Sequence, residues 1–169
     1  MSKNTAIIYS YHTHKSKKVS EKIIEAFGKS KIEAVNAEEL NSEVLEKYDN
    51  FILSAPTWFD GELPNYWDEF VPELEEIDLK GKKFAIFGLG NQKDYPENFC
   101  DAIGILAEII EDCGGETIGH TSIEGYNYES SKAQRGNEFV GLPLDQENQA
   151  RKTNERLKKW VEELKKEFS

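Results

Sequence analysis

The segment that most constrains the fold runs from Ala6 to Val19 and joins a strand to a helix. Its first four residues, AIIY, are apolar and rich in β-branched side chains. Such a run is typical of a strand buried on both faces of a sheet. From Val19 onward the apolar residues recur at helical spacing, which predicts an amphipathic helix. This helical stripe consists of Val19, Ile23, Ile24 and Phe27.

The loop between them, Ser10–Ser16, is polar and includes His12, Thr13, His14 and Lys15. A loop that leads into a helix directs free backbone N–H groups and the positive end of the helix dipole at one point. That arrangement suits a phosphate group. The alternative is an ordinary connection in which Ser16 caps the helix, and this loop by itself leaves both readings open.

Further along the chain, apolar runs alternate with helical patterns. We expect strands at Ile32–Val35, Phe51–Ala55, Phe84–Gly88 and from Glu116 to Gly119. Between them we expect a short helix around Tyr66–Val71 that Pro72 shortens or bends, and a long helix from Asn98 to Gly114-Gly115. A last helix carries Leu157, Trp160, Val161, Leu164 and Phe168. The alternation predicts one α/β domain over residues 1–169, with a doubly wound parallel sheet and helices on both faces.

One long stretch does not fit this alternation. Thr121–Gly141 has no apolar periodicity and is rich in Ser, Gly, Asn and Tyr, so it is too long for a routine connection. Phe139–Leu144 is apolar again and is our candidate for resuming the sheet.

The charge balance restricts the partners. The chain carries 21 Lys and Arg against 32 Asp and Glu, a net charge of −11. This disfavours nucleic acid and anionic membranes and favours partners with basic faces. The sequence has neither an apolar run long enough to cross a membrane nor a signal segment, and Cys100 and Cys113 are read as reduced thiols, so we expect a cytoplasmic protein. No metal is expected, because His12 and His14 have no third ligand nearby.

In a doubly wound sheet, ligands bind beyond the carboxyl ends of the strands. The loops there are Ser10–Ser16, Ala55–Pro64 and Leu89–Glu97. The second contains Trp58, and the third contains Tyr95. Two aromatic side chains on neighbouring loops can flank a flat ring, so that these loops together suit a mononucleotide. The alternative is that the aromatic side chains only cover the core.

Motifs for other nucleotide sites are missing. Lys93 stands where a dinucleotide-binding G-x-G-x-x-G would have its third glycine, and the chain has no G-x-x-x-x-G-K-[ST]. It also has no G-x-S-x-G nucleophile motif.

Four segments, APTWFDGEL, FGLGNQKDYPENF, GYNYESSKA and FVGLPLDQENQ, resemble long-chain flavodoxins, which are FMN-binding electron carriers. The resemblance covers essentially the whole chain. It implies a flavodoxin-like five-stranded parallel sheet of order 2-1-3-4-5, with a long insertion in the fifth strand at about Thr121–Gly141.

The resemblance also implies a site for FMN. Trp58 and Tyr95 would sandwich the isoalloxazine ring, Asn91 with nearby backbone would contact its pyrimidine edge, and Thr13 and Ser16 would contact the phosphate. The whole implied set is Tyr11, His12, Thr13, His14, Lys15, Ser16, Pro56, Thr57, Trp58, Phe59, Asp60, Gly61, Gly90, Asn91, Tyr95 and Asn98.

The chain departs from the family pattern at four places in this set. His14 replaces a glycine, Tyr11 replaces Ser or Thr, Asn91 replaces the usual Asp, and Phe59-Asp60 replaces a pair that contains Asn.

The implied function is a low-potential electron carrier in which FMN cycles between semiquinone and hydroquinone, with no catalytic residue. The implied partners are redox proteins with basic faces, such as a ferredoxin/flavodoxin-NADP reductase and acceptor oxidoreductases, and we expect a monomer. Two alternatives stay open: an FMN-dependent NAD(P)H quinone or nitro reductase, and a flavin-free module that kept the fold.

Overall fold

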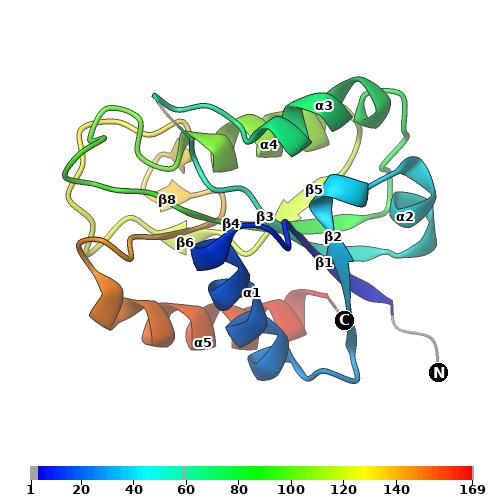
Figure 1. The fold of residues 1–169 in the computed structure, drawn as a ribbon, viewed down its shortest axis with the longest axis horizontal. Helices are drawn as coiled ribbons and strands as arrows, with labels where there is room; N and C mark the ends of the chain where they lie inside the picture. Colours follow the sequence, from blue (N-terminus) through cyan, green and yellow to red (C-terminus); the bar gives the residue numbers. More distant parts are fainter. Residues whose placement is uncertain (1–3, 59, 169) are drawn as a thin grey trace.

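The computed structural model describes residues 4–58 and 60–168 and has a central parallel sheet (Figure 1). Its strands follow the order β2-β1-β3-β4-β5, which confirms the order expected from the sequence. These strands are β1 (Thr5–Tyr9), β2 (Ile32–Asn36), β3 (Asn50–Ser54), β4 (Lys83–Leu89) and β5 (Glu116–Ile118).

Two short strands share the fifth position of the sheet. β5 pairs with Lys83–Ala85, and β9 (Leu142–Leu144) pairs with Phe87–Leu89 further along β4. The segment between them is the expected insertion. It forms a small antiparallel sheet in the order β6-β8-β7, so Phe139 belongs to that sheet rather than to the central one. Its strands are β6 (Thr121–Ser122), β7 (Gln134–Arg135) and β8 (Glu138–Phe139).

Helices cover both faces of the central sheet. In Figure 1, α1 (His14–Phe27) and α5 (Ala150–Glu167) lie on one face, and α3 (Asn65–Leu74) and α4 (Asp101–Asp112) lie on the other. A 3₁₀ turn, η1 (Ala37–Glu39), and the short helix α2 (Ser42–Lys47) connect β2 to β3. The sequence pattern did not predict α2.

Several helix ends differ from the sequence-based prediction. α1 begins at His14 with Thr13 as its N-cap, so Ser16 lies inside the first turn and is not the cap. α3 continues past Pro72 to Leu74, because burying Leu74 and Phe70 stabilises a helix that lacks one hydrogen bond. α4 begins at Asp101 rather than Asn98, and its N-cap Cys100 has a left-handed backbone with φ of 51°.

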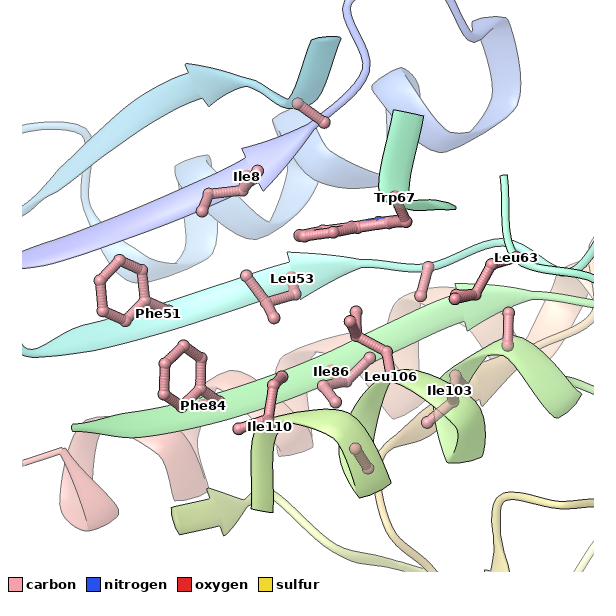
Figure 2. Packing of buried hydrophobic residues seen from close by; sticks show 14 of the residues in the cluster. Ile8, Phe51, Leu53, Leu63, Trp67, Phe84, Ile86, Ile103, Leu106 and Ile110 are labelled. Atoms are coloured by element: carbon pink, nitrogen blue, oxygen red, sulfur yellow. The ribbon is translucent and has the colours of Figure 1, made fainter. Parts of the chain in front are cut away.

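Buried side chains of the sheet pack against those of α3 and α4, and this core supports the loops at the ends of the strands (Figure 2). Phe51 and Phe84 stack with ring centroids 4.9 Å apart. Trp67 is buried, and its indole nitrogen donates a 2.8 Å hydrogen bond to the Ser54 carbonyl at the end of β3. Gly88 lets β4 lie close to β3, because a Cβ there would lie 2.2 Å from the Ala55 carbonyl oxygen. The ends of β3 and β4 are therefore held firmly.

Candidate functional site

A cavity of about 410 Å³ lies at the carboxyl edge of the sheet. This volume is typical of a small-molecule site. All three expected loops contribute to it, and so does the segment before α5, which the sequence analysis missed. The lining residues are Lys15, Pro56, Thr57, Leu89, Gly90, Asn91, Asp94, Tyr95, Gln146 and Glu147.

The backbone amides of the first loop divide into two groups. Those of Tyr11, His12 and Thr13 donate to the Asn36 side chain, the Ser10 hydroxyl and the Ser10 carbonyl. The next three, in residues 14–16, form the first turn of α1 and have no acceptor within the part of the chain that the structure describes. Free amides at a helix N-terminus attract an anion, so this turn is suited to a phosphate.

Two side chains of this loop, Thr13 and His12, already have partners within the protein, whereas His14 is exposed. The Thr13 hydroxyl donates a 3.0 Å hydrogen bond to the Ser10 carbonyl, so its hydrogen is already used. Nδ1 of His12 lies 2.9 Å from one carboxylate oxygen of Glu38, and the other oxygen accepts a hydrogen bond from the Ser10 hydroxyl. Glu38 was not predicted, and it directs His12 toward η1. His14 is exposed at the start of α1.

An ion pair spans the cavity between its first and last segments. The Lys15 ammonium contacts the Glu147 carboxylate, and both residues line the cavity. Both side chains are more than half exposed, at 59% and 51%, so solvent screens the pair and a bound anion could compete for Lys15.

In the second loop, the backbone of Trp58 forms a bridge with Glu62 through two hydrogen bonds of 2.9 and 2.8 Å. Gly61 makes this turn with φ of 92°, and a Cβ there would lie 2.7 Å from a carboxylate oxygen of Asp101. The Thr57 hydroxyl accepts a 3.0 Å hydrogen bond from the Ala102 amide of α4. The loop is thus fastened to the start of α4.

The Trp58 ring does not line the cavity that contains Tyr95. It packs edge-to-face on Tyr66, with centroids 5.9 Å apart, and lines a neighbouring hollow of about 490 Å³ against α3. Burial raises the pKa of Tyr66. Of the predicted neighbours, Asp60 is exposed and Phe59 lies outside the described residues.

In the third loop, Tyr95 is 44% exposed and lines the cavity. The side-chain oxygen of Asn91 accepts hydrogen bonds from the amides of Lys93 and Asp94, at 3.1 and 2.9 Å, so this side chain shapes the turn. Asn98 does not line the cavity. Its side-chain amide donates a 3.3 Å hydrogen bond to the Asp101 carboxylate, below the second loop.

The segment Gln146-Glu147, which the sequence analysis missed, is placed at the cavity by the topology of the sheet. It follows β9, which runs parallel to β4 and therefore ends at the same edge of the sheet. Its position depends on how the insertion returns the chain to the sheet.

Comparisons with known proteins agree with this arrangement. A family model described as flavodoxin matches residues 7–160. A flavodoxin from a Nostoc species is 42% identical over 168 residues, which cover 99% of both chains. A flavodoxin from Trichodesmium erythraeum is 46% identical over 158 residues, or 92% of both chains. The crystal structure of Fusobacterium nucleatum flavodoxin bound to flavin mononucleotide superposes with a TM-score of 0.92 at 35% identity, covering 99% of this chain and 100% of that one.

Proposed function

We propose, since this chain belongs to the flavodoxin family, that it is a small electron carrier that binds one FMN non-covalently in a single domain spanning residues 1–169. The observation that carries the proposal is the cavity itself. Lys15, which belongs to the first turn of α1 with its free amides, lines the cavity, and so does the exposed Tyr95. A phosphate and a flat ring are the two parts of FMN that these features would recognise.

The residues present fit this cofactor. The amides of His14, Lys15 and Ser16, together with the Lys15 ammonium, would hold the phosphate. Pro56, Thr57, Gly90, Asn91 and Tyr95 would surround the ring. Gly90 has no room for a side chain, because a Cβ there would lie 2.6 Å from the Cys100 sulfur. Tyr11, His12, Thr13, Trp58, Phe59, Asp60, Gly61 and Asn98 complete the proposed set, with Asn98 and Gly61 supporting the loops from below.

FMN supplies the redox chemistry by accepting and donating single electrons. The chain binds and orients it, and no side chain has to act as an acid, base or nucleophile. Carboxylates such as Asp94 and Glu147, which line the cavity, disfavour additional negative charge on a bound group. One such charge at 10 Å contributes about 1–2 kcal/mol at an effective dielectric constant near 20, so several of them would lower the reduction potential.

Membership in the family implies redox partner proteins. We propose that these partners present basic faces, such as a ferredoxin/flavodoxin-NADP reductase and acceptor oxidoreductases, because the net charge is −11. We also propose a monomer in the cytoplasm. The location is supported by two free thiols, Cys100 and Cys113. In the described part of the chain, no helix has both the length and the apolar character needed to cross a bilayer.

The test is reconstitution of the purified apoprotein with FMN, riboflavin and FAD, followed by chromatography of the flavin that remains bound. We expect one FMN per chain and weaker retention of riboflavin. Stoichiometric FAD, or no flavin at all, would overturn the proposal. Steady oxidation of NAD(P)H with a quinone, without a separate reductase, would instead support the reductase alternative, which the similarity to flavodoxins does not favour.

A further inference from the structure

Asp145 follows β9 directly and has a fully buried side chain that accepts five hydrogen bonds. One carboxylate oxygen accepts from the backbone amide of Gln92, the side-chain amide of Gln92 and the side-chain amide of Asn148, each at 2.9 Å. The other accepts from the backbone amides of Glu147 and Asn148, at 3.1 and 3.0 Å. Its acceptor capacity is therefore largely used within the protein.

Gln92 is the partner that belongs to the third loop, in which Asn91 and Tyr95 line the cavity. It is only 6% exposed, although it lies in a loop whose neighbours are mostly exposed. Its side-chain oxygen accepts a 2.5 Å hydrogen bond from the Asn127 amide of the insertion. Asn148 adds a second link, a 2.8 Å hydrogen bond to the side-chain oxygen of Asn91. Asp145 and Gln92 together thus connect three segments that are distant in sequence.

No lysine or arginine forms an ion pair with Asp145 among the residues that the structure describes. Its buried charge is therefore stabilised by neutral donors, each of which would lose its partner if the carboxylate were removed. Such a group has little capacity left for a ligand. Its effect on a ligand must pass through the segments that it holds.

Those segments are two walls of the cavity. Gln92 lies between Asn91 and Tyr95, and the Tyr95 amide closes the turn with a 2.9 Å hydrogen bond to the Asn91 carbonyl. The hydrogen bond from the Glu147 amide fixes the opposite wall. We propose that Asp145 is a positioning residue for the flavin, acting through Gln92 to hold the loop that contacts the ring. This inference rests on the proposed function.

The substitutions Asp145→Asn and Gln92→Ala test the inference, singly and together. Asp145→Asn keeps the size of the side chain but places an amide donor among donors. We expect each single change to weaken riboflavin and FMN to the same extent, by about tenfold, as for loss of a buried hydrogen bond. Because both changes break one connection, we expect the double variant to be no weaker than the weaker single variant.

Fluorescence titration of the apoproteins gives the affinities, and hydrogen exchange of the amides of residues 91–95 gives the order of the loop. Glu111→Gln is the matched control, since it changes a carboxylate to an amide far from the cavity, and it should leave both readouts unchanged. Additive effects, a loss confined to FMN, or a lower melting temperature with parental affinities would each overturn the inference.

If Asp145→Asn does not fold, the comparison of riboflavin with FMN in Gln92→Ala decides the matter by the same criteria. If the parent itself binds no flavin, the proposed function fails. Faster exchange at residues 91–95 in the variants would then still support the role of Asp145 in holding the loop, and unchanged exchange would refute it.

Discussion

Tyr95 and Trp58 differ in how much of each ring already packs against protein. Tyr95 is 44% exposed on the cavity wall, whereas Trp58 is half-buried and packs edge-to-face against Tyr66. A ligand ring can therefore cover Tyr95 without displacing a protein contact. To cover Trp58, it would share that ring with Tyr66. The two aromatics should contribute unequally to binding.

We expect Tyr95→Ala to weaken FMN binding and raise the potential of the second reduction step, because aromatic stacking contributes about 0.5–1.5 kcal/mol beyond burial. Trp58→Ala should have a smaller effect on that potential. Fluorescence titration and spectroelectrochemistry measure both quantities, and Tyr95→Phe, which keeps the ring, should retain the parental affinity. If both alanine variants match the parent, the flavin binds elsewhere.

At the scale of elements, α4 connects the insertion to the rest of the fold. Near its end, Glu111 accepts two hydrogen bonds from the Arg135 guanidinium, at 2.8 and 2.6 Å, and one from the Thr117 hydroxyl. Near its start, Asp101 accepts a 2.8 Å hydrogen bond from the Lys132 amide. Gly104 allows the insertion to lie directly on the helix, since a Cβ there would lie 2.1 Å from the Lys132 carbonyl oxygen.

The hydrogen bond from Arg135 is the main reason that the pKa of Glu111 is lowered. A carboxyl with a lowered pKa stabilises the fold above its ordinary titration range, and this contribution is lost as the pH falls through the folded-state pKa. We expect Glu111→Gln to lower the melting temperature by about 1–4 °C at pH 7, as for a partly exposed ion pair.

Thermal unfolding of parent and variant between pH 3 and 8 measures this effect. The difference between them should shrink as the pH falls below the ordinary titration range of a glutamate, and it should vanish only below the lowered folded-state pKa. A difference that is as large at pH 3 as at pH 7 would show that the ion pair is not its cause.

Across the whole molecule, the charges are distributed unevenly between helices α1 and α5 and the rest of the chain. α1 and α5, which lie on one face, carry eleven lysines and arginines against six acidic residues, while the rest of the chain carries ten against twenty-six. The acidic excess thus lies outside these two helices. A basic partner should dock on that acidic surface.

We expect electron transfer to a basic haem protein to slow steeply as ionic strength rises, because exposed charges are screened beyond about 10 Å at 0.1 M salt. Glu69→Gln on α3, in the hollow beside Trp58, should slow the reaction at low salt. Glu155→Gln, an equal change on α5, should not. Stopped-flow kinetics measures the rates, and a flat salt dependence would exclude a docking role for the acidic surface.

The sequence by itself determined the type and order of the main elements. Continuous apolar runs such as Ala6–Tyr9 and Phe84–Gly88 identified strands that are buried on both faces, and an apolar period of 3.6 residues identified the amphipathic helices. The order of the sheet and the interruption of its last strand came from the resemblance to flavodoxins, and both are confirmed. Helix ends such as Thr13 and Cys100 were not recovered, because a cap depends on local backbone geometry.

Only the tertiary structure decided which side chains meet at the site. The pairing of His12 with Glu38 and the packing of Trp58 on Tyr66 require segments that are separate in sequence. The contact between Asp145 and Gln92 spans 53 positions, and it exists because β9 returns beside β4. Hydrogen-bond partners are set by distance in space, which a periodic pattern along the chain does not encode.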